Sequence, residues 1–73
     1  MGATTFTNLN GEVEVRIYSI IGRHVITLRN QGAAEVAWNL LNEQGHPVAS
    51  GVYFWLAMGA NGKSKVGRIA VIR

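Results

Sequence analysis

The chain has 73 residues, the size of one small domain, so we expect residues 1–73 to form a single folded unit. Hydrophobic residues make up 48% and charged residues only 15%, a balance that excludes a disordered chain and predicts a packed core. The net charge is +3, cysteine is absent and no apolar run approaches the ~18 residues of a membrane span, which excludes disulfides, thiolate metal sites and a spanning helix.

A sequence period of two dominates the chain. The residues from Glu12 to Ile17 alternate polar and apolar without a break, which is typical of a strand with one buried face. Glycines separate segments that are rich in Val, Ile and Thr, as in all-β sandwiches and barrels. We therefore predict six short strands, at Ala3–Asn8, Glu12–Ser19, His24–Asn30, Glu35–Leu40, Val52–Met58 and Ser64–Ile72.

The connections between these strands carry residues that tight turns need. Asn10-Gly11 predicts a hairpin between the first two strands, because both residue types tolerate positive φ. Further turns are predicted at Ile21-Gly22-Arg23 and at Ala60-Asn61-Gly62. The longest connection, Asn42–Ser50, is predicted to be a capped turn in which the Asn42 side chain accepts a hydrogen bond from the amide two residues further on.

Three segments resemble a family of small bacterial immunoglobulin-like domains. The first is Ile17-Tyr18-Ser19-Ile20-Ile21-Gly22-Arg23-His24-Val25. The second is Trp38-Asn39-Leu40, followed by a polar turn and Pro47-Val48-Ala49-Ser50-Gly51-Val52-Tyr53. The third is the last strand, Lys65-Val66-Gly67-Arg68-Ile69-Ala70-Val71-Ile72-Arg73. The family includes the domain of the flagellar hook-capping protein and the C-terminal sorting domains of proteins exported by the type IX secretion system.

The resemblance implies an immunoglobulin-like antiparallel β-sandwich of six to seven strands. It also implies a non-enzymatic, C-terminal module of a longer protein that is exported, displayed on the cell surface or secreted. Such a module is a folded tag read by secretion machinery, or a spacer or scaffold domain. Two features depart from the family: no Asn-Pro strand precedes Thr5–Thr7, and Asn39 and Asn42 stand where the family often has aspartates that could hold a cation.

The apolar positions of the predicted strands define the expected core. Trp38 is assigned to this core rather than to a sugar-stacking platform, because such a platform needs several exposed aromatic residues with polar partners. The expected core residues are Phe6, Val13, Val15, Ile17, Val25, Leu28, Val36, Trp38, Tyr53, Trp55, Ile69 and Val71.

The segment from Val52 to Met58 is the strongest candidate for a contact surface. Alternation places Tyr53, Trp55 and Ala57 on one of its faces and Val52, Phe54, Leu56 and Met58 on the other. Because both faces are apolar, two interpretations stay open. Either this is a central strand covered on both sides, or it exposes an apolar stripe that contacts a partner.

Partner contacts are expected where this stripe meets the basic end of the chain. Phe54 and Leu56 would be the apolar anchors, and the basic residues would steer encounter. The partner would be secretion machinery or the parent protein, and the missing first strand would leave an unpaired edge that favours a homodimer or strand exchange. The expected contact residues are Val52, Phe54, Leu56, Met58, Lys63, Lys65 and Arg68.

No reaction is predicted from the titratable residues. Glu12 and Glu14 are about 7 Å apart on one strand face, within the ~5–9.5 Å of a glycosidase pair, but glutamates on such a face are usually only solvated. No serine or threonine is matched with a histidine and a carboxylate as in a catalytic triad. His24 and His46 with scattered glutamates are too few ligands for zinc. We therefore expect no catalytic residue, metal or cofactor.

Two other binding functions are weighed against the resemblance. A small basic β-barrel that binds single-stranded nucleic acid would match the size of the chain and its run Tyr53-Phe54-Trp55. Consecutive aromatic residues of a strand face opposite ways, however, and the aromatic signature of ribonucleoprotein domains is missing. A carbohydrate-binding accessory module is the other alternative. The sequence therefore predicts no nucleic-acid partner.

Overall fold

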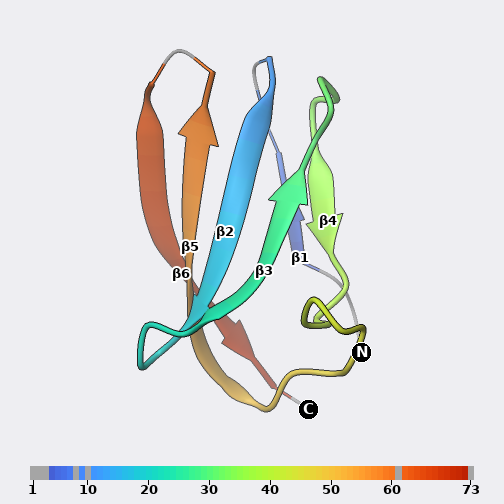
Figure 1. The fold of residues 1–73 in the computed structure, drawn as a ribbon, viewed down its shortest axis with the longest axis vertical. Helices are drawn as coiled ribbons and strands as arrows, with labels where there is room; N and C mark the ends of the chain where they lie inside the picture. Colours follow the sequence, from blue (N-terminus) through green and yellow to red (C-terminus); the bar gives the residue numbers. More distant parts are fainter. Residues whose placement is uncertain (1–3, 8, 10, 61, 73) are drawn as a thin grey trace.

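The computed structural model describes residues 4–7, 9, 11–60 and 62–72. This part of the chain contains six strands joined by turns and loops, and no helix (Figure 1). The strands are β1 (Thr4–Phe6), β2 (Val13–Ser19), β3 (His24–Arg29), β4 (Val36–Trp38), β5 (Gly51–Gly59) and β6 (Ser64–Val71). They form a four-stranded sheet in the order β3-β2-β5-β6 and a two-stranded sheet of β1 and β4, and all pairs are antiparallel. The predicted immunoglobulin-like sandwich is confirmed.

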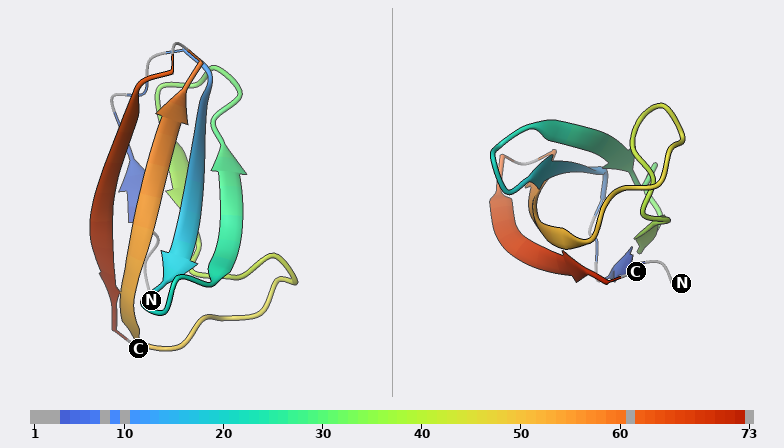
Figure 2. Two further views of the ribbon diagram at one scale, coloured as in Figure 1. Left: turned by 60° about the vertical axis from the view of Figure 1, so that its left-hand side comes forward. Right: turned by 90° about the horizontal axis from the view of Figure 1, so that it is seen from below.

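The two sheets meet closely along one side of the sandwich only. Strand β4 contacts β3, whereas no Cα atom of β1 lies within 8 Å of a Cα atom of β6. Seen from below, β4 follows β3 around the molecule and β1 lies on the side of β6 (Figure 2). The sandwich is therefore closed between β3 and β4 and open between β1 and β6.

The hairpin predicted between the first two strands is wrong. Strand β1 crosses to the opposite sheet and pairs with β4, in the register Thr4↔Trp38 to Phe6↔Val36. Asn10 lies outside the described residues, and Gly11 has the expected positive φ of 73°. A hairpin with β1 is not available to β2, because β3 and β5 pair with its two edges. On the opposite sheet, Phe6 packs on the aromatic ring of Trp55.

Several strand boundaries also differ from the prediction. Strand β5 is one residue longer at each end, whereas β2, β3 and β6 each lose one terminal residue. The expected strand at Glu35–Leu40 is reduced to three residues, because Leu40 adopts a left-handed backbone with a φ of 66° that ends the ladder. Strand β1 is likewise short, and Ala3 and Asn8 lie outside the described residues.

All of the expected core residues belong to one hydrophobic cluster. Val15, Ile17 and Trp38 are fully buried, so the choice of a core role for Trp38 over a sugar platform is confirmed. The prediction missed two core residues, Leu40 and Val48, which are 4% and 8% exposed. Neither lies in a strand, but Leu40 continues the alternation of Val36 and Trp38, so only the burial of Val48 falls outside the pattern that defined the other positions.

The connection from Leu41 to Ser50 is fixed to the core by side chains of Trp38 and Tyr53. Trp38 Nε1 donates to the Leu41 carbonyl at 2.9 Å, and the Tyr53 hydroxyl donates to the Ala49 carbonyl at 2.6 Å. The two rings pack edge to face with centroids 5.6 Å apart. The family-like tryptophan and tyrosine thus have an architectural role, which is to hold the long loop beneath the sandwich.

Within this loop, Asn42 acts as the predicted cap. Its Oδ1 accepts from the amides of Gln44 and His46, both at 3.0 Å. Gly45 has a φ of 80°, and its amide donates to the Asn42 carbonyl. These bonds satisfy the backbone of the turn locally, so the loop keeps a defined shape without secondary structure.

Candidate partner-binding surfaces

The outer face of the four-stranded sheet carries the expected apolar stripe. Val52 and Met58 are about 40% exposed, and Phe54 and Leu56 are half-buried. Strand β5 lies between β2 and β6, so it is a central strand, but the second sheet covers only its inner face. The interpretation that β5 is covered on both sides is therefore wrong.

Polar side chains border the stripe on one flank. Strand β2 places Glu14, Arg16 and Tyr18 opposite Met58, Leu56 and Phe54. On the other flank β6 places Ser64, Val66 and Arg68 opposite the same three residues. The stripe is consequently bordered by long polar chains on the β2 side, whereas on the β6 side it continues onto the exposed Val66 beside Arg68.

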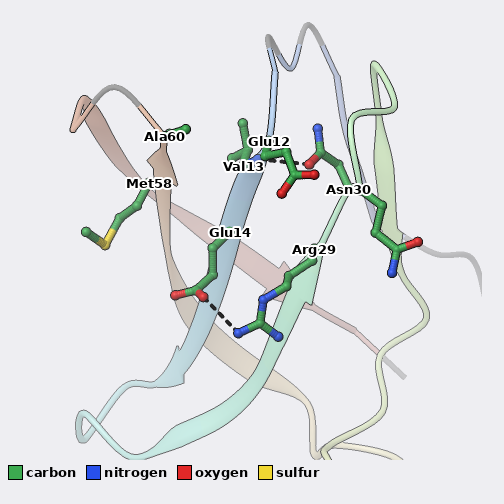
Figure 3. Close-up of a pocket in the computed structure, with 9 residues that line it drawn as sticks. Glu12, Val13, Glu14, Arg29, Asn30, Met58 and Ala60 are labelled. Carbon is green, nitrogen blue, oxygen red and sulfur yellow. Dashed lines mark hydrogen bonds and ion pairs between the residues drawn. The ribbon is translucent and has the colours of Figure 1, made fainter.

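A small surface pocket of about 270 Å³ lies at the upper end of β2, where Glu14 meets Arg29 (Figure 3). Arg16 Nε donates to one oxygen of Glu14 at 2.6 Å and Arg29 donates to the other at 3.0 Å. The hydrogen bond from Arg16, with the nearby positive charges, holds the pKa of the Glu14 carboxyl below its usual value. Glu14 therefore stays ionised at neutral pH, whereas a glycosidase acid must hold a proton.

Asn30, in the same pocket, has a structural role (Figure 3). It is 6% exposed, and its Oδ1 accepts from the Val13 amide at 2.8 Å. Its Nδ2 donates to the carbonyls of Gly11 and Ala33 at 2.8 and 2.6 Å. The side chain ties the entry of β2 to the exit of β3, and its polar atoms are occupied by backbone.

The two histidines lie in different surroundings. The ring of His24 packs edge to face on Tyr18, and its Nε2 lies 2.8 Å from Thr27 Oγ1. Its Nδ1 is 3.8 Å from a carboxylate oxygen of Glu43. His46 lies in the long loop. Among the residues that the structure describes, no three His, Asp or Glu side chains are grouped as metal ligands would be.

The open side of the sandwich forms a groove of about 820 Å³ between β1 and β6. This groove was not predicted from the sequence. We call it the β1–β6 groove. Its apolar floor comes from both sheets and includes Phe6, Val13, Trp55, Ala57 and Ile69. Three of the expected contact residues line it as well, namely Lys63, Lys65 and Arg68, and all three are exposed.

Trp55 occupies the centre of the floor because its cross-strand neighbour is Gly67. A Cβ atom on Gly67 would lie 2.5 Å from Cζ2 of the indole, so only glycine leaves room for the ring. On its other side the indole meets Phe6 edge to face, with ring centroids 5.4 Å apart. This arrangement could have been found from sequence, because counting back across the Ala60-Asn61-Gly62 turn places Gly67 opposite Trp55.

The expected contact residues therefore fall into two groups. Val52, Phe54, Leu56 and Met58 lie along the outer face, whereas the basic residues lie around the β1–β6 groove. Arg68 belongs to both surfaces, since it is the cross-strand neighbour of Phe54 and also lines the groove.

Three exposed isoleucines were not singled out from the sequence. Ile20 and Ile21 occupy the turn between β2 and β3, and Ile72 follows β6. The turn between β2 and β3 and the end of β6 both lie toward the lower end of the molecule as drawn in Figure 1. The apolar character of the three isoleucines is not explained by the core, since each is at least 66% exposed.

The run Tyr53-Phe54-Trp55 does not present one stacking surface. Tyr53 is buried and Trp55 lies on the inner face, whereas Phe54 faces outward beside Tyr18 and Arg68. The expected alternation of these rings is confirmed. In the described residues, no helix is long and apolar enough to cross a membrane.

Comparisons with known proteins give one match of note. The chain superposes with a TM-score of 0.72 on part of PorZ, an essential bacterial surface component of the type IX secretion system of Porphyromonas gingivalis. The two are 29% identical, and the match covers 99% of this chain but only 12% of PorZ. No protein-family model matches the chain, and no curated protein matches it. The chain thus shares its immunoglobulin-like fold with a domain-sized part of a type IX secretion component.

Proposed function

We propose that this domain is a non-enzymatic recognition module of a protein that the type IX secretion system exports or displays at the cell surface. The observation that carries the proposal is the match of nearly the whole chain, at 29% identity, to part of a surface component of that system. The chain spans 12% of the length of PorZ, so the activity of a parent protein is not transferred with the fold.

The environments of the titratable groups support a non-enzymatic role. Glu14 is engaged by two arginines, and His24 by Tyr18 and Thr27. Asn30 is saturated by backbone groups. These contacts are of the kind that fix a surface rather than position a reacting substrate, so recognition through shape, apolar area and charge is the mechanism we favour.

We propose a C-terminal position in a longer parent protein and a role as a sorting tag. A scaffold role of the hook-capping kind is the second candidate, because both roles can use the same fold.

A reporter fusion tests the export role. The domain is fused to the C-terminus of a periplasmically targeted fluorescent protein in a bacterium with a type IX secretion system. Export is measured as reporter in the medium and as protease-accessible reporter on intact cells. We expect export with the intact domain and periplasmic retention with Trp38→Ala, which removes the core residue that holds the long loop.

A host strain in which the secretion system is inactivated is the matched control. Reporter that remains periplasmic with the intact, folded domain contradicts the sorting role and leaves the scaffold role. Reporter that leaves the cell equally in the inactivated strain contradicts it too, because the export would then not depend on that system.

The open sheet edges also support the predicted homodimer or strand exchange. Strands β3 and β6 each have one neighbour in their sheet among the described strands. Sedimentation velocity at about 100 µM protein tests this, since self-association rises with concentration. A strictly monomeric mass would contradict the homodimer without affecting the export proposal.

A further inference from the structure

Strand β6 offers one edge of hydrogen-bonding groups to the β1–β6 groove. In an antiparallel ladder, every second residue pair exchanges backbone hydrogen bonds. The Gly59 amide donates to the Lys63 carbonyl, so Gly59 and Lys63 form a pair of this kind. The register from Ala57↔Lys65 to Gly51↔Val71 runs without a bulge, so the odd-numbered residues of β6 direct their backbone groups toward β5. The backbone groups directed at the free edge are those of Ser64, Val66, Arg68 and Ala70.

The edge of β6 is not paired with β1. No Cα atom of β1 lies within 8 Å of one in β6, further than the spacing of about 4.8 Å between paired strands. The hydrogen-bonding groups of this edge therefore face the groove. The groove of about 820 Å³ is of the size that binding sites have.

The floor of the groove supplies apolar anchor sites. Trp55 lies against Gly67 in β6 and against Phe6 in β1, so the indole spans the gap between the two sheets. Ala57 and Ile69 extend the apolar surface along β5 and β6. Every second side chain of a strand added to β6 would face this floor.

The rim of the groove carries only positive charge. Lys65 leaves β6 on the inner face, opposite Ala57, and Arg68 leaves it on the outer face, opposite Phe54. With Lys63, which also lines the groove, three cations surround the free edge. None of the described residues that line the groove is acidic.

We propose that the free edge of β6 binds an extended segment of another protein in which apolar and acidic residues alternate. The segment adds a strand to the four-stranded sheet through the backbone groups of Val66 and Arg68. Its apolar side chains lie on the Trp55 floor, and its carboxylates, which alternate with them and so face outward, meet Arg68, while Lys65 adds positive charge at the rim. The inference concerns binding at β6 and holds whether or not the domain directs export.

A second copy of this chain is a poorer occupant of the same edge. The segment from Lys63 to Val71 contains three cations and no acidic residue. Antiparallel pairing of two β6 strands would bring six cations close together along one ladder, which is destabilising. Charge on an edge strand is a common means of preventing such self-pairing. The charge that excludes a copy favours an acidic partner.

Hydrogen exchange with designed peptides tests the proposal. The probe is a seven-residue capped peptide in which Val alternates with Glu, and its matched control has Lys in place of Glu. Binding is followed by NMR on the ¹⁵N-labelled domain at 0.15 M salt. We expect the Glu peptide to protect the amides of Val66 and Arg68, with little change at Gly67 and Ile69, whose amides already face β5.

Charge-reversal variants test whether the edge of β6 selects an acidic peptide or pairs with any extended peptide. The double variant Lys65→Glu with Arg68→Glu should bind the Glu peptide about tenfold more weakly, through the loss of the exposed ion pair at Arg68 and the reversed charge at Lys65, and should bind the Lys peptide better. Arg23→Glu, in the exposed turn between β2 and β3, is the matched control and should leave the affinity unchanged. A dispersed NMR spectrum confirms that each variant is folded.

Several outcomes would overturn the proposal. Equal protection by the Glu and Lys peptides would show an edge without charge selectivity. Protection confined to β3 would place the binding at the other edge of the sheet. Absence of protection at millimolar peptide would show that the edge does not accept a strand. Protection of Val66 and Arg68 that rises with domain concentration alone would make a second copy the occupant.

Discussion

Gly67→Ala is the substitution whose effect the structure determines most directly. The added Cβ would lie 2.5 Å from Trp55 Cζ2 and 2.7 Å from Nε1, whereas non-bonded carbon atoms prefer separations of about 3.5–4.0 Å. The indole therefore has to move by about 1 Å. Phe6 holds its other side, so the movement also disturbs their edge-to-face contact.

The expected loss of stability follows from two opposing effects. Forcing an extra methyl group into a packed site costs about 1–3 kcal/mol. Removing a glycine from a strand offsets about 0.5–1 kcal/mol of this through the lower entropy of the unfolded chain. Gly67 is not among the positive-φ glycines, so alanine adds no backbone strain. We expect a net loss of about 1–2 kcal/mol, which lowers the Tm by about 5–15 °C in a domain of this size.

Thermal and urea unfolding, followed by far-UV circular dichroism, measure this loss. The matched background is Trp55→Leu, in which the smaller side chain leaves room for the methyl group. In that background Gly67→Ala should cost less than about 0.5 kcal/mol, so the double-mutant cycle should give a coupling energy of about 1 kcal/mol or more. A Gly67→Ala variant as stable as the native domain, or an equal cost in both backgrounds, would refute the packing argument.

Three further substitutions test contacts elsewhere in the fold. Trp38→Phe removes the indole N–H that donates to the Leu41 carbonyl, and should lower the free energy of unfolding in urea by about 1–3 kcal/mol. Asn30→Ala leaves backbone groups of two connections without partners and should lower the Tm, whereas Asn30→Gln, which keeps the amide but displaces it, should recover little of the loss. Because Arg16 lowers the pKa of folded Glu14, the stability from this carboxylate is complete above the unfolded pKa of about 4.3 and is lost as the pH falls through the folded value. Glu14→Gln should therefore be less stable than the native domain at pH 7, and the difference between the two urea midpoints should shrink as the pH falls below about 4.3.

Much of the fold could be predicted because the chain is strongly patterned. The alternation in β2 identifies Val15 and Ile17 as buried, and the structure leaves neither with any exposed area. The glycine turns located the hairpins that join β2 to β3 and β5 to β6. Such signals are local, since each depends on a few neighbouring residues and on the period of two.

The errors came from long-range effects. Strand β1 cannot pair with β2, because β3 and β5 occupy both edges of β2, and it pairs with β4 instead. Val48 is buried because the loop returns beneath the sheets, where Trp38 and Tyr53 donate hydrogen bonds to it. Periodicity within a strand contains no information on either point.

The sequence could predict which residue types form the candidate site, but not how they are arranged in space. The sequence showed a basic end and an apolar strand, and it placed both in one contact surface. In the structure the apolar stripe faces outward from β5, whereas Lys63 and Lys65 lie at the groove on the other side of β6. The groove exists because of where β1 lies relative to β6. These strands belong to different sheets, and no local sequence pattern specifies how the two sheets are placed.

The two surfaces differ in what they offer a partner, and the difference favours the groove as the specific site. The stripe around Leu56 continues onto the exposed Val66 of β6 and is bordered by the salt-bridged Glu14 and Arg16 of β2, so it supplies apolar area but no free strand edge. The groove combines an apolar floor at Trp55, a free strand edge and three exposed cations, and none of the described residues that line it is acidic. Apolar anchors provide affinity, the backbone edge fixes the orientation, and the charge selects among partners. A partner bound at β6 would therefore lose more affinity through Lys65→Glu than through Leu56→Ala, whereas one bound on the outer face would show the reverse order.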